Sequence, residues 1–314
     1  MRRYLINRLL LLVPTVIGVS VLVSGLVRLI PGGAEVAFCQ EGCPPEQRAE
    51  IRRQLGLDQP FPVQYARWLA NALRGDLGES FQTKRDVAQD IRTRLPVTFQ
   101  LGVMAMIIGL LIALPVGVIS AIRQDSVLDY AARSSAIALL SVPSFWIGTV
   151  IIAYGGKLYN WAPPLTWKSI FESPTENLTI TLIPAVILGA ALSGTVMRLT
   201  RAQMLEVMRQ DYIRTAWAKG LREWTVVIRH AIRNAFIPVV TLIGLQVPVL
   251  VGGSVILETI FNIPGIGRYL LTAILQRDYP IIQGVNLVVA SAIVLANLIV
   301  DISYSLLDPR VRYA

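Results

Sequence analysis

Three consecutive segments decide the fold: LTITLIPAVILGAALSGTVM (178–197), RLTRAQMLEVMRQDYIRTAWAKGLREWTVVIRHAIR (198–233) and, after Asn234, AFIPVVTLIGLQVPVLVGGSVIL (235–257). The first and last contain no ionisable residue, and each is about as long as a helix must be to cross a bilayer, roughly 20 residues. The middle segment carries eight Arg or Lys and three acidic residues. Connections between neighbouring helices are usually only a few residues long. We therefore expect residues 198–233 to form a structured docking surface between two membrane spans.

The composition of the whole chain is that of a membrane protein. Of 314 residues, 54% are hydrophobic and 16% are charged, and the mean hydropathy is +0.57. A soluble domain carries about 25% charged residues. Because backbone groups in lipid must be paired internally, uncharged apolar blocks predict helices. We expect an all-α polytopic fold with six transmembrane helices: Leu9–Val27, Phe99–Ile122, Ser134–Gly156, Leu178–Met197, Ala235–Leu257 and Ile281–Val300.

Prolines and the first apolar block need separate interpretation. We expect six prolines inside the blocks to kink or interrupt the helices, as neighbouring helices in a bundle allow: Pro14, Pro115, Pro143, Pro184, Pro238 and Pro248. The first block is longer than the apolar region of a signal peptide, and no small-residue cleavage site follows it. We interpret it as a retained first span.

The distribution of charge predicts the orientation. If the N-terminus is cytoplasmic, residues 1–8, 123–133, 198–233 and 301–314 lie on the cytoplasmic side, and they hold fifteen Arg or Lys against seven Asp or Glu. Nearly all of the net charge of +9 then lies inside, which fits the positive-inside rule and makes nucleic-acid binding a poor explanation of that charge. Both termini are expected to be cytoplasmic.

The chain is accordingly expected to have three parts. Residues 1–30 form the cytoplasmic N-terminus and the first span, residues 31–96 form an extracytoplasmic helical segment, and residues 97–314 form a five-span core with the loop 198–233. In the outer segment, Pro and Gly punctuation predicts a helix over Glu46–Leu55. A second helix after Pro60 has one apolar stripe, made of Tyr65, Trp68, Leu69, Ala72 and Leu73.

Cys39 and Cys43 are the only cysteines, and both fall in the expected outer segment. Disulfides form in such oxidising compartments, although closing so short a loop removes little chain entropy. A disulfide, two free thiols and a metal site all remain open. The metal site has least support, because zinc needs about four ligands and the only histidine, His230, is expected on the other side.

The chain lacks the groups that would power transport or catalysis. It has no Gly-x-x-x-x-Gly-Lys-Ser/Thr loop to hold nucleotide phosphates, and its expected spans contain no carboxylate or histidine to relay protons. A catalytic set for an intramembrane enzyme is missing as well. We expect a non-catalytic transport subunit that takes its energy from another protein. A self-sufficient channel or secondary transporter is the alternative.

Uncharged polar residues do enter the expected spans. Gln246 and Asn286 are the first candidates for the wall of a translocation pathway. The alternative is that these amides only hydrogen-bond neighbouring helices together.

The basic loop has the properties of a partner-binding surface. Gly220 and Leu221 divide two helix-compatible stretches, Glu206–Lys219 and Arg222–Ala235. Arg214, Lys219 and Arg222 could form charge-assisted bonds with acids of a partner, and the small side chains of Ala216 and Ala218 would permit close approach. Binding of the loop to anionic lipid headgroups is the alternative.

Several motifs resemble those of the dipeptide/oligopeptide/nickel ABC-transporter permeases, in the same order along nearly the whole chain. The loop supplies Asp211-Tyr212-Ile213-Arg214-Thr215-Ala216, Ala218-Lys219-Gly220-Leu221 and Arg229-His230-Ala231-Ile232-Arg233-Asn234-Ala235. Further similar motifs are Leu57-Asp58-Gln59-Pro60, Gly75-Asp76-Leu77-Gly78, Pro143-Ser144-Phe145-Trp146, Glu258-Thr259-Ile260-Phe261, Arg277-Asp278-Tyr279-Pro280 and Leu307-Asp308-Pro309-Arg310.

The resemblance implies a function and a set of partners. In that family the loop is a coupling helix that contacts a cytoplasmic ATPase. The residues expected to couple here are Asp211, Arg214, Thr215, Ala216, Lys219, Gly220, Leu221 and Arg222. The implied partners are a similar second permease, two ATPase subunits that bind ATP and Mg²⁺, and an extracytoplasmic solute-binding protein. This chain itself would hold no cofactor. Its place would be the inner membrane of a prokaryote, and its cargo peptides, with nickel complexes or sugars as alternatives.

Overall fold

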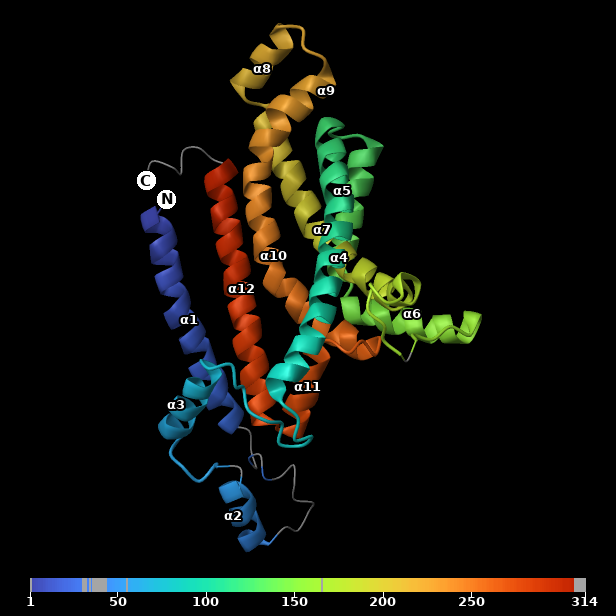
Figure 1. The fold of residues 1–314 in the computed structure, drawn as a ribbon. Helices are drawn as coiled ribbons and strands as arrows, with labels where there is room; N and C mark the ends of the chain where they lie inside the picture. Colours follow the sequence, from blue (N-terminus) through green and yellow to red (C-terminus); the bar gives the residue numbers. More distant parts are fainter. Residues whose placement is uncertain are drawn as a thin grey trace. The chain divides into compact units, whose positions relative to one another are not determined.

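A computed structural model of the chain describes residues 2–29, 33, 35, 44–54, 56–164 and 166–307. These residues form helices and their connections, with one isolated bridge between Glu79 and Asp86 (Figure 1). The expected all-α class is confirmed. The chain divides into two compact units, each made of two separate segments: unit 1 is Met1–Thr98 with Pro264–Leu295, and unit 2 is Phe99–Ile263 with Ala296–Ala314.

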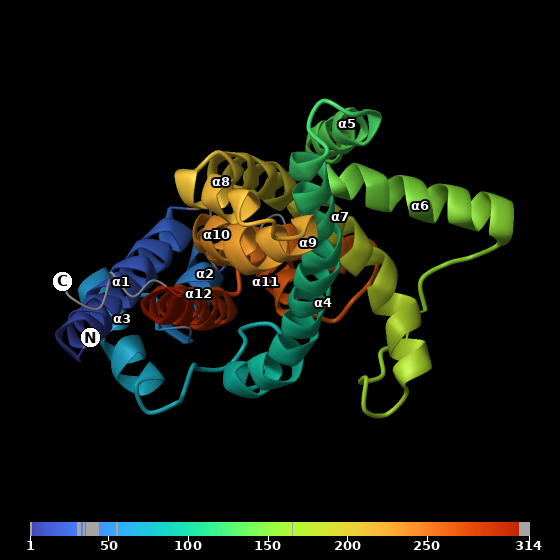
Figure 2. The same cartoon turned by 90° about the horizontal axis from the view of Figure 1, so that it is seen from above.

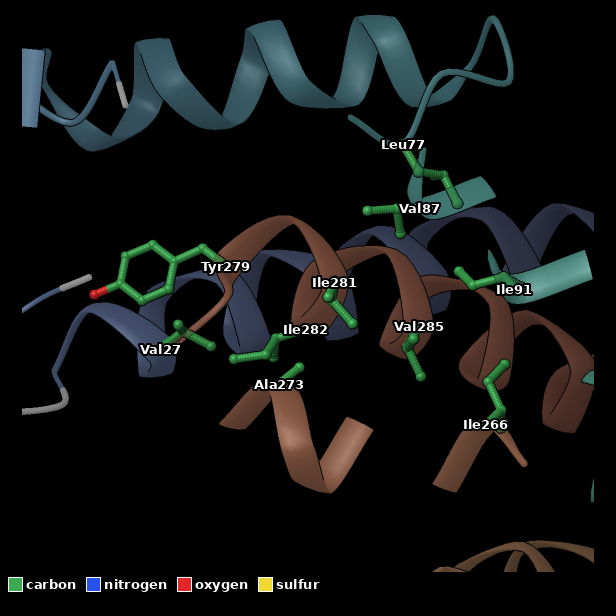
Figure 3. Packing of buried hydrophobic residues seen from close by; sticks show 10 residues of the cluster. All are labelled: Val27, Leu77, Val87, Ile91, Ile266, Ala273, Tyr279, Ile281, Ile282 and Val285. Carbon is green, nitrogen blue, oxygen red and sulfur yellow. The ribbon is translucent and has the colours of Figure 1, made fainter. Parts of the chain in front are cut away.

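Unit 1 contains short helices around the ends of long apolar ones. Its elements are α1 (Arg2–Arg28), α2 (Pro45–Gln54), α3 (Phe61–Ala72), the first turns of α4 (Val87–Ile122), α11 (Ile266–Gln276) and most of α12 (Tyr279–Leu307). Figure 3 shows its core, in which residues from α1, α4, α11 and α12 meet: Val27, Leu77, Val87, Ile91, Ile266, Ala273, Tyr279, Ile281, Ile282 and Val285. The two helices expected near residues 46–55 and after Pro60 are present as α2 and α3.

Polar contacts close this core at the junction of α11 and α12. Asp278 is fully buried, and its Oδ2 accepts bonds from Ser80 Oγ at 2.6 Å and from the backbone N of Gln82 at 3.2 Å. Tyr269 Oη donates to Asp90 Oδ2 at 3.1 Å. Burial raises the pKa of the Tyr269 hydroxyl, and the negative charge of Asp90 acts in the same direction. Segments almost 200 positions apart in sequence are thereby tied together.

Unit 2 is built around α7 (Pro174–Met208), which packs against α5 (Val127–Ser141) and α10 (Arg233–Ile260). Small residues bring α7 and α4 close together. A Cβ placed on Gly109 would lie 2.8 Å from the carbonyl oxygen of Gly189, and one on Gly189 would lie 2.7 Å from that of Ala105. Small residues allow the same close approach in membrane helix pairs generally.

Five of the described helices are long and apolar enough to cross a membrane: α1, α4, α7, α10 and α12. The expected third span, Ser134–Gly156, is not one straight helix. It is divided into α5 and α6 (Ser144–Tyr159), whose axes differ by 86°, so α5 is seen nearly end-on in Figure 2 while α6 is seen from the side. Pro143 forces Val142 into an extended conformation (φ −95°, ψ 121°), which ends α5. A sixth span exists only if this bent pair counts as one.

Candidate functional site

The loop between α7 and α10 is folded throughout. It contains α8 (Asp211–Ala218), α9 (Glu223–Thr225) and a π-helix, η2 (Val226–Ile232), which leads directly into α10. Figure 1 shows α8 and α9 beyond the ends of α7 and α10. The stretch expected as one helix from Glu206 is interrupted, because α7 continues to Met208 and Gln210 is extended (φ −73°, ψ 149°) before α8 begins. The division at Gly220 is as expected.

Gly220 ends α8 with a turn that requires glycine. Its φ is +74°, its N–H donates to the carbonyl of Trp217 at 2.9 Å, and the N–H of Leu221 reaches back to the carbonyl of Ala216 at 3.4 Å. This pair of bonds is the Schellman arrangement, which satisfies carbonyls at a helix end through a left-handed residue. The turn therefore fixes the direction in which the chain leaves α8.

α8 has one buried face and one exposed face. Ile213 and Ala216 pack into a cluster with Met204, Val226, Val227 and Ala231. Ala216 is 6% exposed, so its small size serves packing within the loop and its methyl group is not presented to a partner. The other seven expected coupling residues are exposed: Asp211, Arg214, Thr215, Lys219, Gly220, Leu221 and Arg222.

The exposed face carries charges that are only weakly engaged. Arg214 Nη1 lies 3.4 Å from Asp211 Oδ1, and both side chains are largely in solvent. Thr215 Oγ1 donates to the carbonyl of Asp211 at 2.9 Å, which is a bond within the helix. Tyr212 Oη accepts from Asn234 Nδ2 at 2.8 Å and so connects α8 to the start of α10. The loop thus presents exposed charged groups on a helix whose other face is packed against its neighbours.

A cavity beside α9 extends this surface. It has a volume of about 450 Å³ and lies between the end of α4 and α9, with walls that include Ile122, Arg123, Arg222 and Trp224. Trp224 is 73% exposed. The walls of this cavity thus combine apolar side chains and the Trp224 indole with two guanidinium groups and the carboxylate of Glu223.

A buried ion pair near the loop was not predicted from the sequence. Asp129 on α5 is fully buried, and Arg201 on α7 meets it with two bonds of 2.6 Å, from Nε to Oδ1 and from Nη2 to Oδ2. Ser120 Oγ donates to Oδ1 at 2.5 Å, and the backbone N of Asp125 donates to Oδ2 at 3.0 Å. Ser126, which caps α5 by accepting from the N–H of Asp129, is the one local signal for this region.

The two pathway candidates lie in different units. Gln246 on α10 belongs to unit 2 and Asn286 on α12 to unit 1, and both are half-buried. Asn286 Nδ2 donates to the carbonyl of Ile282 at 2.8 Å, within its own helix. Their role in a pathway stays a prediction. Cys39 and Cys43 lie outside the described residues. Across the described ranges, no three His, Cys, Asp or Glu side chains come close enough to hold a metal ion.

Two family comparisons cover nearly the whole chain. The family described as binding-protein-dependent transport system inner membrane component matches residues 113–313, and the N-terminal family of the same systems matches residues 1–102. The chain belongs to this family. The resemblance read from the motifs is therefore confirmed, and the chain is a multi-pass inner-membrane component of a binding-protein-dependent transport system.

Relatives of this permease are similar over their full length. The dipeptide transport system permease protein DppB of Escherichia coli (strain K12) is 38% identical over 100% of this chain and 99% of its own. A protein of Brucella abortus (strain 2308) named as a peptide transport system permease is 40% identical over 100% of both chains. The dipeptide permease DppB of Alkalihalophilus pseudofirmus is 37% identical, also over 100% of both.

A solved structure gives a weaker match. The crystal structure of an amino acid ABC transporter with histidines has a TM-score of 0.48 and 17% identity over 71% of this chain and 94% of that one.

Proposed function

We propose that this chain is the membrane-spanning permease subunit of an ATP-driven importer for dipeptides or oligopeptides. The observation that carries the proposal is the identity of 37–40% to peptide and dipeptide permeases, over the full length of both partners in each comparison. Because the alignments extend over the whole chain, we expect this chain to have the same transport function as these relatives. Nickel complexes and sugars remain alternative cargoes, and the names of these relatives favour peptides.

The proposed topology has six spans, with α5 and α6 together counted as the third. Both termini and the loop with α8 are cytoplasmic, while α2 and α3 are extracytoplasmic. The concentration of Arg and Lys in the segments assigned to the inside supports this orientation. The chain would form half of a translocation pathway, and a homologous second permease would complete it. Gln246 and Asn286 would then form part of an uncharged pathway wall that has little selectivity for the cargo. Selectivity would come from the solute-binding protein.

The proposed role of α8 is to receive force from a cytoplasmic ATPase. Asp211, Arg214, Lys219 and Arg222 are exposed on elements whose buried faces pack on the ends of α7 and η2. A push on this surface would pass to α7 and α10 through side chains that are already in contact. ATP and Mg²⁺ would bind to two ATPase subunits, and this chain would perform no chemistry.

Reconstitution tests the proposal directly. Proteoliposomes would hold this chain with its second permease and ATPase subunits, and the solute-binding protein would be added outside. We expect uptake of radiolabelled L-alanyl-L-alanine that requires ATP and the binding protein, and no uptake by this chain alone. Uptake by the isolated chain would instead establish a channel or secondary transporter. ATP-dependent uptake of a nickel complex or a sugar with none of peptide would establish the alternative cargo.

A further inference from the structure

Unit 1 contains a cavity of about 220 Å³ beside the end of α1 and along α3. Its walls include Arg28, Gln59, Arg67, Trp68, Asn71 and Tyr279. Two of these residues are arginines, and none of the side chains that line the cavity is acidic. An excess of positive charge in a confined space with low-dielectric walls favours an anionic ligand.

Arg28 carries the charge that this cavity presents. Its Nη1 donates to the carbonyl of Ser24 and its Nη2 to Gln64 Oε1, each at 2.6 Å. Its Cζ lies 4.8 Å from the ring centroid of Phe61 and 5.9 Å from that of Tyr279. All of these partners are neutral, and a guanidinium has five N–H donors. Donors therefore remain for a further acceptor.

The acidic side chain that lines an adjoining cavity with Arg28 is already engaged. Glu35 lines an adjoining cavity of about 240 Å³ together with Arg28 and Arg52. Its Oε1 accepts from Arg52 Nη1 at 3.1 Å. Within the described part of unit 1, no carboxylate is paired with Arg28. A half-buried cation whose partners among the described residues are all neutral gains most from an anion that arrives from outside.

Two further polar atoms at the cavity lack partners. Trp68 Nε1 and Gln59 Oε1 are buried, and neither has a hydrogen-bond partner among the described residues. Such atoms are uncommon in folded proteins, and each calls for an explanation such as a bound water, ion or ligand. Trp68 supplies an N–H donor and Gln59 a carbonyl acceptor on the walls of the same cavity. A ligand that both accepts and donates hydrogen bonds would satisfy them together.

We propose that this cavity binds the α-carboxylate end of a short peptide, an assignment that rests on the proposed peptide cargo. The two oxygens of a carboxylate fit the fork of a guanidinium, and the adjacent amide N–H can donate to Gln59. Small-molecule sites usually measure roughly 300–1,000 Å³. A cavity of about 220 Å³ therefore holds one end of a peptide and leaves the rest outside. Unit 1 thus contributes an outer contact for cargo in addition to the pathway candidates Gln246 and Asn286.

Binding to the assembled transporter tests the assignment without the solute-binding protein. The complex is placed in phosphatidylcholine nanodiscs, and calorimetry compares L-alanyl-L-alanine with its C-terminal amide. We expect the amide to bind about 10- to 100-fold more weakly, because charge-assisted bonds are lost. Equal affinity of the two, or no saturable binding of either, overturns the carboxylate site. ATP-dependent peptide uptake in the reconstitution would still stand in that case, so the two failures are distinguishable.

Variants locate the site. Arg28→Gln and the exposed Arg67→Gln are expected to weaken binding of the acid and leave that of the amide unchanged. Trp68→Phe keeps the aromatic wall and removes only the N–H donor, so a loss of affinity of about fivefold or more assigns that donor to the ligand. Arg53→Gln is the matched control, since Arg53, on α2, does not line the cavity and its side chain pairs with Glu50 at 3.6 Å. Unchanged affinity in both arginine variants overturns the proposal.

A lipid phosphate is the competing source of an anion. Replacing part of the phosphatidylcholine with phosphatidylglycerol separates the two possibilities. A peptide site keeps its affinity for L-alanyl-L-alanine in either lipid. Competitive loss of that affinity with phosphatidylglycerol, abolished by Arg28→Gln, assigns the cavity to a lipid headgroup and overturns the peptide assignment.

Discussion

Two aspartate–arginine pairs in the described part of unit 2 share the same chemistry but differ in burial and geometry. Asp129 and Arg201 are joined by two bonds of 2.6 Å, with Asp129 fully buried and Arg201 19% exposed. Asp211 and Arg214 approach to 3.4 Å on α8, with both side chains mostly in solvent. Both pairs lie in segments that the charge distribution assigns to the cytoplasmic side.

The difference separates groups that hold the unit together from groups that are free to bind. A buried carboxylate has lost its hydration, so removing its counter-ion leaves an uncompensated charge. When an exposed ion pair forms, contacts between its two charged groups replace contacts that each group had with water. Its net contribution to stability is therefore close to zero. The charges on α8 can therefore turn to a partner at little cost, whereas those of Asp129 and Arg201 cannot.

The largest effect is expected from breaking the buried pair. Asp129→Asn leaves the Arg201 guanidinium without a counter-ion, and we expect the free energy of unfolding to fall by about 3–5 kcal/mol. Thermal and denaturant unfolding of the detergent-purified chain measures this. Asp125→Asn is the control, because Asp125 is exposed, its hydrogen bond to Asp129 comes from the backbone N–H, and its carboxylate acts on Arg201 only through its charge. Equal stability of the two variants would contradict the structural role of the pair.

A smaller loss of stability is expected when the Ser120 hydroxyl, which donates to Asp129, is removed. Ser120→Ala removes the bond of 2.5 Å to Asp129 Oδ1. A hydrogen bond to a charged group contributes about 1.5–3 kcal/mol to stability, so unfolding should become easier by that amount. In the control Ser135→Ala, the lost bond runs only to the carbonyl of Ala132 in the same helix, and little change is expected. In the same unfolding assay, Ser120→Ala should be less stable than Ser135→Ala.

The two pairs also show how far sequence reasoning reaches. Asp211 and Arg214 are three residues apart, so helical periodicity alone brings them together. Asp129 and Arg201 are separated by 72 positions, and only the packing of α5 on α7 makes them neighbours. The same holds for the cavity of unit 1, whose walls come from α1, α3 and α12.

Local signals predicted local structure well. Gly220 marks the end of α8, Pro and Gly residues mark α2 and α3, and long uncharged runs mark five helices able to cross a membrane. The sequence predicts the break between α5 and α6 but not the angle between them. Pro143 predicted an interruption, but the angle of 86° depends on what each helix packs against. Which face of α8 is buried likewise followed from tertiary contacts of Ile213 and Ala216.

Substitution of Gly220 is expected to reduce stability less than breaking the buried pair Asp129–Arg201 and more than breaking the exposed pair Asp211–Arg214. A Cβ at this position meets no atom within 4 Å, so the cost of a side chain comes only from the left-handed backbone. Gly220→Val should therefore cost about 1–2 kcal/mol or redirect the chain after α8. Gly220→Asn is the matched variant, since asparagine tolerates this conformation. We expect ATP-dependent peptide uptake to be lost with valine and largely kept with asparagine. Full uptake by the valine variant at equal abundance would refute coupling through this turn.

The exposed pair should have the smallest effect on stability and a distinct effect on assembly. Arg214→Gln and Asp211→Asn are expected to leave the melting temperature unchanged, because neither side chain is desolvated. If Arg214 bonds to an acid of the ATPase, Arg214→Gln should weaken ATPase binding by about tenfold. Raising the salt concentration should weaken binding of the original chain and narrow the difference from the variant, since screening acts on exposed charges. Arg209→Gln, just outside α8, serves as the control for a general loss of positive charge. If Arg214→Gln lowered the melting temperature but left ATPase binding intact, the contrast between the two pairs would be wrong, and α8 would be a structural element like the Asp129 network.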